Sequence, residues 1–442
     1  MLDIKFIREN KEKIIISLKK KNCNIDIEKL ISLDKRRRKL IQSSEELKAE
    51  QNEASKKISK LTGDEKKNAI KKMSELKERL SALENDLNAA QEDIDSLVRQ
   101  IPNLPFDDVP EGINETENVV LREVGEKPDF SLFEPKDYLT IAQNLDIIDV
   151  ERAGKVSGSR FGYLKNEAAL LEFALVQMAF SVLIPEGFKT IVPPVMIKKE
   201  MMQGMGYADT LEDEEERYYF EKDKLYLVGT SEQSVGPMHS GEILSEKDLP
   251  VRYAAFSSCF RREAGSYGKD TKGILRVHQF DKVEMFSFCR PDDSRDEHAL
   301  FLKMEEKLMQ SLKIPYRIVQ LCTGDLSRPS ATTIDIEAWL PGQNEGKGLY
   351  REVSSTSNTT DFQARRLNIK YRDPGIPGMI GGGMIPVPPS LKYVHAVNGT
   401  GFAIGRIIIA IIENYQTSDG FVNIPDALKP WMHGVEVIKR AS

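Results

Sequence analysis

Cysteine is scarce in this chain of 442 residues, and its four cysteines are widely scattered. No CxxC pair occurs among them, which argues against a zinc knuckle and against a disulfide framework. The five histidines form no HExxH motif or other paired spacing typical of a metal site. Neither sign of charge dominates, because 63 Lys and Arg residues stand against 69 Asp and Glu residues. The net charge of −6 therefore argues against a protein that coats nucleic acid over its whole surface, but not against a local basic patch.

Long hydrophobic runs are also missing. The longest unbroken one, residues 407–412, is far shorter than the roughly 18 residues of a membrane span. Asp3 and Glu9 stand in the first turns, where a signal peptide or an acid-poor transit peptide carries no acidic residues. We therefore expect no membrane contact and a cytoplasmic location. The 40% hydrophobic content still suffices for a sizeable core, which excludes a disordered chain.

The common sequence signatures of nucleotide and acyl chemistry are absent as well. Gly381-Gly382-Gly383 is not followed by Lys-Ser or Lys-Thr, so it is no P-loop, and the surrounding stretch 374–389 is expected to be a surface loop. No GxSxG elbow supports Ser-His-Asp catalysis. What remains is ATP chemistry of another kind.

The first quarter of the chain has the pattern of a helical hairpin. Apolar residues recur at 3-4 spacing over 30–61 and again over 73–101, on either side of the breaker Thr62-Gly63-Asp64. Two such seams predict two antiparallel helices of about 30 residues, on the order of 45 Å long. Arg37, Ser44 and Gln51 fall on the first seam, where apolar residues are expected.

The charge of this arm is uneven near its breaker. Between positions 56 and 72 the only acidic residues are Asp64 and Glu65, against seven lysines: Lys56, Lys57, Lys60, Lys66, Lys67, Lys71 and Lys72. One interpretation is a solvated coiled-coil surface. The other is a phosphate-binding tip, because clustered lysines supply the salt-dependent part of nucleic-acid binding.

From about residue 110 the pattern changes to a mixture of strands and helices. The stretch 170–183 predicts part of a long, largely buried helix, followed by a turn at Gly187 and a strand over 190–194. Further strands are expected at 225–228, 253–256, 282–288 and 333–339. Because short loops often join successive strands, a mostly antiparallel sheet is favoured over a doubly wound one.

The stretch 259–286, CFRREAGSYGKDTKGILRVHQFDKVEMF, carries the most information about function. It predicts a strand that ends at residues 260–263, a glycine-rich charged loop, and a return strand from Arg276 to Glu284. Alternation then places Phe280, Lys282 and Glu284 on one face. One groove would then contain an arginine that can bind phosphate, a phenylalanine that can stack on a base and a carboxylate that can bind an ammonium group. A purely structural hairpin is the alternative.

The same stretch resembles motif 2 of the class II aminoacyl-tRNA synthetases, in the form found in the seryl-tRNA synthetase family. GFKTIVPPVM is similar to motif 1, with Pro193 or Pro194 as its proline, and NGTGFAIGRIIIAIIENYQ resembles motif 3, with Arg406 in the arginine position. VGTSEQ resembles the serine-pocket segment and YREVSSTSNTTDFQARR the acidic ATP segment. MLDIKFIREN, the arm and IPNLPFDDVP look like the N-terminal domain, so the resemblance covers essentially the whole chain.

The resemblance implies an α+β fold. Residues 1–109 would form a tRNA-binding domain with an antiparallel α-helical coiled-coil arm over about 30–101. Residues 110–442 would form a class II catalytic domain with an antiparallel β-sheet flanked by helices. Motif 1 implies a homodimer, whose arm would reach a tRNA on the other subunit.

The implied activity is that of a serine–tRNA ligase. Serine and ATP would give seryl-adenylate and pyrophosphate, and serine would then pass to the 3′ end of tRNA(Ser), with charging of selenocysteine tRNA left open. Mg²⁺ would accompany ATP, and no structural zinc is expected. Two rivals are a binding protein that has lost activity and a ligase that loads a carrier protein; the retained site residues argue against the first and the long arm against the second.

The family pattern transfers a role to individual positions. The catalytic arginines would be Arg261, Arg276 and Arg406. The ATP-binding residues would be Arg261, Arg262, Glu263, Val277, Phe280, Glu352, Val353, Ser354, Ser355 and Arg406. The serine-binding residues would be Thr230, Ser231, Glu232, Arg261, Glu284, Asn398 and Thr400. Glu352 and Ser355 would hold the metal ion, and the seven lysines of the arm would bind tRNA.

Some positions depart from the family pattern. Thr332 and Ile334 stand where a lysine (or similar residue) and a tyrosine are usual, and Thr356 replaces a common cysteine. The glycine-rich loop around Gly381 is longer than usual. Thr400 stands where many relatives have serine, which keeps the hydroxyl and adds a methyl group. These departures concern the shape of the pocket and leave the phosphate and metal positions intact.

Overall fold

The computed structural model describes residues 2–58, 61–264, 272–374, 378–380, 383–385 and 389–440. The chain forms two compact units, Met1–Pro102 and Asn103–Ser442. The first is helical and the second is built around a large, mainly antiparallel sheet. The predicted α+β class with an N-terminal helical arm is therefore confirmed.

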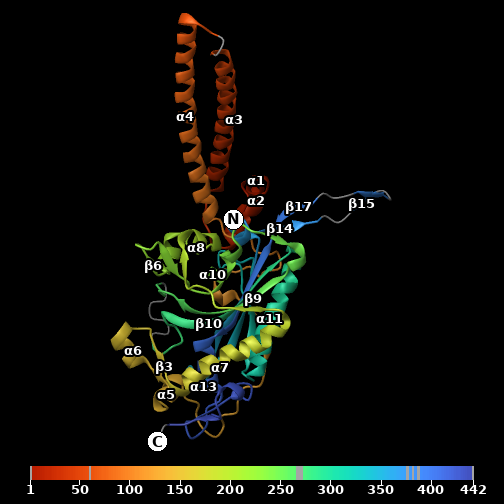
Figure 1. The fold of residues 1–442 in the computed structure, drawn as a ribbon. Helices are drawn as coiled ribbons and strands as arrows, with labels where there is room; N and C mark the ends of the chain where they lie inside the picture. Colours follow the sequence, from red (N-terminus) through yellow and green to blue (C-terminus); the bar gives the residue numbers. More distant parts are fainter. Residues whose placement is uncertain are drawn as a thin grey trace. The chain divides into compact units, whose positions relative to one another are not determined.

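The N-terminal unit consists of four helices, of which the last two form the arm. They are α1 (Ile4–Glu9), α2 (Lys11–Lys20), α3 (Ile27–Ile58) and α4 (Gly63–Gln100). Figure 1 shows α3 and α4 side by side and antiparallel, as the two apolar seams predict. Leu47, Leu76 and Leu80 are buried between them, whereas most other side chains of the arm face solvent. Burial of a single narrow stripe is typical of a two-helix coiled coil.

A polar cluster explains one of the seam positions that the apolar pattern could not. Asp34 is fully buried on α3, and its carboxylate binds Arg8 at 2.7 Å, Arg37 at 2.8 Å and Arg38 at 3.1 Å. Arg37 also donates to Gln91 of α4 at 2.9 Å. A buried charge requires such partners, so Arg37 ties the two helices together through hydrogen bonds instead of apolar contact.

The C-terminal unit is organised by an eight-stranded sheet. Its strand order is β1-β11-β12-β13-β18-β10-β9-β4, and only the β4–β9 pair is parallel. The strands are β1 (Val119–Val124), β4 (Lys189–Ile191), β9 (Val251–Phe260), β10 (Gln279–Cys289), β11 (Tyr316–Gln320), β12 (Thr332–Leu340), β13 (Leu349–Thr360) and β18 (His395–Ala403). β10, β13 and β18 lie in its centre, and they carry eight of the 17 residues expected at the catalytic site: Phe280, Glu284, Glu352, Val353, Ser354, Ser355, Asn398 and Thr400.

Three long helices cover one side of this sheet and complete the core. They are α7 (Asn166–Leu183), α11 (Ser294–Ser311) and α13 (Ile404–Asn414). α7 contacts both other helices, and all three contact β18 (Figure 1). By length and composition alone, the segment Asn166–Glu186 could also cross a membrane. Its packing in the core is the pattern expected of a buried helix in a globular domain.

The remaining elements are short. The other helices are α5 (Tyr138–Asn144), α6 (Val150–Ser157), α8 (Lys199–Met205), α9 (Leu211–Glu215), α10 (Glu232–Val235) and α12 (Phe362–Leu367). The first group of short strands comprises β2 (Ile148–Asp149), β3 (Tyr163–Leu164), β5 (Met196–Lys198), β6 (Tyr219–Phe220), β7 (Leu225–Leu227) and β8 (Ile243–Ser245). The second comprises β14 (Lys370–Asp373), β15 (Gly378–Ile380), β16 (Gly383–Ile385), β17 (Ser390–Tyr393), β19 (Val422–Asn423) and β20 (Val437–Ile438).

Three local expectations differ from the structure. The strand expected over 190–194 is β4, which ends at Ile191 before the two prolines. The return strand of the 259–286 hairpin begins at Gln279 instead of Arg276, because the preceding backbone bonds elsewhere: the His278 N–H donates to Arg160 O at 3.0 Å. The stretch 374–389 is not a plain loop, since β15 and β16 pair in antiparallel fashion within it. Both strands have the sequence Gly-Met-Ile, and they pair as two extended segments of equal length. Gly381 and Gly382 lie outside the described residues.

Candidate active site

A hollow of about 2500 Å³ opens on the sheet face formed by β10, β12, β13 and β18. A narrower pocket of about 570 Å³ adjoins it, between the segment that precedes β10 and the start of α13. Both lie entirely within the C-terminal unit. The two share Arg261, Glu263, Arg276, Glu352 and Arg406, so they form the two ends of one site.

Most residues transferred from the family pattern meet in this site. Those that line the hollow are Thr230, Glu232, Arg261, Glu263, Arg276, Glu284, Glu352, Ser355, Asn398, Thr400 and Arg406. The narrow pocket adds Val277, Phe280, Val353 and Ser354. These positions span more than 170 residues of sequence, and the central strands bring them together.

Two of the transferred residues line neither cavity. Arg262 is exposed, and its guanidinium lies over the ring of Tyr218 at 5.2 Å. Ser231 is fully buried, and its hydroxyl has no hydrogen-bond partner among the residues that the structure describes. The structure therefore gives neither side chain a direct place at the cavity wall.

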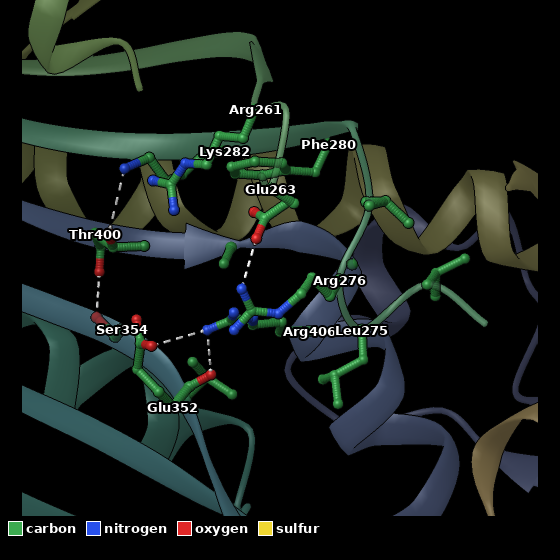
Figure 2. A pocket seen from close by; sticks show the side chains of 15 residues that line it. Arg261, Glu263, Leu275, Arg276, Phe280, Lys282, Glu352, Ser354, Thr400 and Arg406 are labelled. Carbon is green, nitrogen blue, oxygen red and sulfur yellow. Dashed lines mark hydrogen bonds and ion pairs between the residues drawn. The ribbon is translucent and has the colours of Figure 1, made fainter. Parts of the chain in front are cut away.

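The narrow pocket is framed by arginines and one aromatic ring (Figure 2). The Arg261 guanidinium lies 5.2 Å from the centroid of the Phe280 ring, and its Nε donates to Gly229 O at 3.1 Å. Arg276 binds the Glu263 carboxylate at 2.5 Å. Glu263 has φ 54°, a left-handed conformation that costs energy in a residue with a side chain and is often found at functional sites.

Arg406 approaches the same pocket from α13. Its Nη1 donates to the backbone oxygen of Glu352 at 2.8 Å and lies 3.2 Å from the carboxylate of that residue (Figure 2). Burial alone would raise the pKa of Glu352, but the positive charges of Arg406, Arg261 and Lys282 together outweigh it and hold the pKa below its usual value. Glu352 is therefore an anion at neutral pH.

A second acidic side chain stands beside Glu352. Asp335 of β12 is cross-strand neighbour to Ser355 of β13, and both line the hollow. Burial and the negative charge of Glu352 raise the pKa of Asp335 well above its usual value, and Asp335 Oδ1 has no hydrogen-bond partner in the described part of the chain. Oxygen donors of this kind suit a hard cation such as Mg²⁺. Across the described residues, however, no cluster of three or more His, Cys, Asp or Glu side chains is placed to hold a metal by itself.

The hollow also contains a buried carboxylate, Glu284, whose neighbours Lys282 and Thr400 line the narrow pocket as well. Glu284 is 2% exposed on β10, and it pairs with the ammonium of Lys282, which also lies 3.5 Å from Thr400 Oγ1. Burial raises the pKa of Glu284 to about 7, although Lys282 acts in the opposite direction. Glu284 and Lys282 project from the same face of the strand, which the alternating pattern predicts.

Glu232 is buried in the wall next to Glu284. Its carboxylate accepts from Tyr207 at 3.2 Å and from Gln363 at 2.9 Å. Burial raises the pKa of Glu232, and these two donors lower it again in part. Much of its hydrogen-bonding capacity is thus used within the protein, which suits a residue that shapes the pocket wall.

Some lining residues were not predicted as site residues. Lys282 was placed on the correct strand face but given no role, and its two-residue spacing from Phe280 and Glu284 was the available signal. Asp335 follows the family positions Thr332 and Ile334 but was given no role, and Tyr207 carried no recognisable motif, so the tertiary fold reveals both as lining residues. Thr356, a departure from the family pattern, is fully buried and donates to Asn398 O at 2.9 Å. It therefore contributes to the contact between β13 and β18.

The lysines of the arm lie in the other unit. Those within the described residues are all exposed: Lys56, Lys57, Lys66, Lys67, Lys71 and Lys72. Lys57 lies 4.0 Å from Glu53, and Lys67 lies 3.6 Å from Asp64. Such exposed pairs are weak, so both ammonium groups stay accessible to phosphate. Lys60 lies outside the described residues.

Comparison with known proteins decides the family. The tRNA synthetase class II core domain (G, H, P, S and T) matches residues 218–415, and the seryl-tRNA synthetase N-terminal domain matches residues 1–105. A serine–tRNA ligase of Dictyoglomus turgidum is 42% identical over 99% of both chains, and one of Thermodesulfovibrio yellowstonii is 41% identical over 99% of this chain and 100% of its own. The chain belongs to the seryl-tRNA synthetase family.

Solved structures agree with this membership. The crystal structure of seryl-tRNA synthetase from Pyrococcus horikoshii complexed with ATP is 37% identical, with a TM-score of 0.88 and full coverage of both chains. The structure of cytoplasmic serine–tRNA ligase from Naegleria fowleri in complex with AMP is 32% identical, with a TM-score of 0.85. The seryl-tRNA synthetase fold thus extends over the whole chain, arm included.

Proposed function

We propose that this seryl-tRNA synthetase family member activates serine with ATP in the hollow and then transfers serine to the 3′ end of a serine tRNA. The observation that carries the proposal is the gathering of Arg261, Arg276, Arg406 and Phe280 next to the buried pair Glu284–Lys282. Cations and an aromatic ring suit a nucleoside triphosphate, and a buried carboxylate suits an amino acid ammonium.

ATP would occupy the narrow pocket. Phe280 would stack against the adenine ring, with the backbone at Val277 beside it, and Arg406 would cover the opposite face. Arg261 would bridge the α-phosphate and the carboxylate of serine, and Arg276 would reach toward the terminal phosphate. Glu263, now held by Arg276, would accept from the adenine amino group once ATP binds. Val353 and Ser354 also line this pocket, whereas Arg262 is assigned to ATP by the family pattern alone.

Activation then needs little proton chemistry. The carboxylate oxygen of serine attacks the α-phosphorus, the new C–O–P linkage forms, and the bond to the pyrophosphate oxygen breaks. Serine already carries the nucleophile as an anion, so no side chain has to remove a proton. The arginines stabilise the charge that develops on the phosphate oxygens, and catalysis is mainly positioning and electrostatics.

Serine would bind at the Glu284 end of the hollow. Glu284 would accept from the serine ammonium and hydroxyl, with Thr400 and Asn398 at the floor. Thr230 would add a hydroxyl, while Glu232 and Ser231 would fix the wall behind it. A site that pairs the hydroxyl penalises alanine, because a buried polar group would be left without a partner.

Glu352 and Ser355 would hold Mg²⁺, and the orphan oxygen of Asp335 beside them fits a site for a hard cation. When bound, the ion would neutralise charge on the ATP phosphates. The residues of this chain would supply only part of its coordination, with phosphate oxygens completing it.

The arm would recognise tRNA by its backbone. The exposed lysines near the end of α3 and the start of α4 would contact phosphate groups of tRNA(Ser). Lys60 is included in this set by its sequence position. tRNA is a cytoplasmic substrate, so we expect the protein to act in the cytoplasm.

A homodimer is part of the same proposal. Phe173, Ile184 and Val192, in and after α7, are 63%, 53% and 78% exposed in the single chain. Large apolar side chains exposed within one stretch of the sequence favour burial against a partner, here a second copy through the motif 1 region.

The experiment that tests the proposed function is charging of unfractionated tRNA with each amino acid in turn, at saturating ATP and Mg²⁺. Serine alone should become attached to tRNA, in an acid-precipitable and alkali-labile form. Attachment of serine to a protein fraction instead of tRNA would favour the carrier-protein ligase. Charging with another amino acid would refute the proposal.

A further inference from the structure

Tyr138, the first residue of α5, touches the backbone that lines the narrow pocket. It is 5% exposed, and its phenolic oxygen accepts from the Ile274 N–H at 2.8 Å. The preceding residue, Gly273, has φ +75°, and a Cβ placed there would lie 1.9 Å from the same oxygen. Only glycine therefore fits at this position while Tyr138 holds its place.

The other side of Tyr138 is anchored on α13. The Tyr138 N–H donates to Glu413 Oε1 at 3.0 Å, and Glu413 Oε2 accepts from Gly342 N at 2.8 Å. Glu413 is fully buried and lies two helical turns after Arg406 on the same helix. Tyr138 therefore connects the helix that carries Arg406 to the backbone that leads into Leu275, Arg276 and Val277.

We propose that Tyr138 is a positioning residue for the nucleotide end of the site. Its hydroxyl holds the backbone at Ile274 at a fixed distance from α13, so that the backbone at Val277, which would lie beside the adenine, keeps its place relative to Arg406. The inference rests on the function proposed above, because that function places ATP in this pocket. It goes beyond it, since no motif assigns a role to Tyr138.

The hydrogen bond between Tyr138 and Ile274 is buried, which makes it suitable for positioning the backbone. Ile274 and Leu275 are each 6% exposed, so an N–H that loses its partner there cannot turn to water. Burial raises the pKa of Tyr138 to about 12, although the N–H groups of Ile274 and Leu275 favour the ionised form. The hydroxyl thus stays protonated at neutral pH, and its oxygen accepts the backbone hydrogen bond as a neutral group.

Serine binding should not depend on this contact. Glu284 and Thr400 lie on β10 and β18 and are cross-strand neighbours in the central sheet. Their positions are set by the strand ladder and not by the segment 273–277. Loss of the Tyr138 hydroxyl should therefore weaken ATP and leave serine nearly unchanged, a split that general destabilisation would not produce.

The test compares Tyr138→Phe with a matched control, Tyr316→Phe. Tyr316 is 1% exposed, its hydroxyl accepts from Gln310 at 2.9 Å and donates to Glu306 at 3.0 Å, and it lines neither cavity. The readouts are KM for ATP and for serine in pyrophosphate exchange, and the Kd of ATP alone by calorimetry. In Tyr138→Phe, KM and Kd for ATP should rise on the order of tenfold, because a buried donor loses its acceptor.

A second variant, Gly273→Ala, disrupts the same contact by placing a Cβ against the Tyr138 hydroxyl. It should also weaken ATP binding. In the double variant, the fold loss of ATP affinity should be smaller than the product of the two single-variant losses, because both substitutions remove the same contact. The inference is overturned if Tyr138→Phe matches Tyr316→Phe in ATP affinity, or if KM for serine rises as much as KM for ATP. If the wild-type protein shows no serine-dependent exchange, the proposed function fails, whereas the ATP-binding measurement still decides the role of Tyr138.

Discussion

The pKa of Glu284 makes serine recognition depend on pH in the neutral range. Glu284 is 2% exposed, and burial raises its pKa to about 7 in the absence of substrate. Only the ionised carboxylate can pair with the ammonium of serine, which remains protonated throughout this range. Serine should therefore bind well above this pKa and progressively less well below it.

The magnitude follows from the ionised fraction. With a pKa of about 7, roughly 90% of the carboxylate is ionised at about pH 8 and roughly 10% at about pH 6. KM for serine should thus rise about tenfold over this interval, while KM for ATP should not follow the same curve. In Glu284→Gln the pH dependence should disappear. KM for serine should also rise at about pH 8 by roughly ten- to a hundredfold, since a hydrogen bond to a charged group contributes about 1.5–3 kcal/mol.

The assay is pyrophosphate exchange at saturating ATP, with serine varied at each pH. Glu172→Gln is the matched control, because burial raises the pKa of Glu172 to about 8 but its side chain lines a hollow that shares no residue with the hollow proposed to bind serine. Glu172→Gln should keep the wild-type slope. A wild-type KM for serine that is constant between about pH 6 and pH 8, or a slope that survives in Glu284→Gln, would refute the reasoning.

Two further predictions concern the stability of the C-terminal unit and the binding of tRNA by the arm. Asn103 is 4% exposed and donates to the backbone oxygens of Pro329 at 2.9 Å and Thr359 at 2.8 Å, so Asn103→Ala should destabilise the protein by about 2 kcal/mol. A thermal midpoint no lower than that of the exposed control Asn423→Ala would contradict this. A second variant replaces four exposed lysines of the arm by alanine: Lys66, Lys67, Lys71 and Lys72. It should raise KM for tRNA and flatten its salt dependence, with pyrophosphate exchange unchanged. Its control replaces four exposed lysines of the other unit: Lys222, Lys247, Lys347 and Lys439. Equal losses in both variants would argue against a binding role for the arm.

The arm could be read from the sequence almost completely. A single apolar stripe that is interrupted once leaves only one economical arrangement, two antiparallel helices, and α3 and α4 adopt it. The polar residue Arg37 on that stripe could not be explained in advance. Its partners, Asp34 and Gln91, come from two helices, and the second of them lies 54 positions away.

The site was predictable to the extent that strands position it. Alternation along β10 placed Phe280, Lys282 and Glu284 on one face, and the family motifs supplied the arginines that line the same hollow. The start of β10 was placed three residues too early. The N–H groups of Ile274 and His278 donate to Tyr138 and Arg160, outside the ladder, and no local propensity encodes such a choice.

The contacts of Tyr138 could not be predicted from the sequence. Its hydroxyl meets Ile274, 136 positions away, and its N–H meets Glu413, 275 positions away. Each contact joins loops and helix ends whose relative placement is set by the packed core. The pattern around Tyr138 predicts nothing beyond an ordinary amphipathic turn.

The measurement that tests the central claim most directly is ATP–pyrophosphate exchange with each amino acid, carried out with the wild-type protein and with Arg261→Ala. Arg372→Ala, an exposed arginine on β14, serves as the control. We expect exchange with serine alone, a loss of at least about a hundredfold in Arg261→Ala, and full activity in Arg372→Ala. Exchange with a different amino acid, or wild-type activity in Arg261→Ala, would contradict the proposed function.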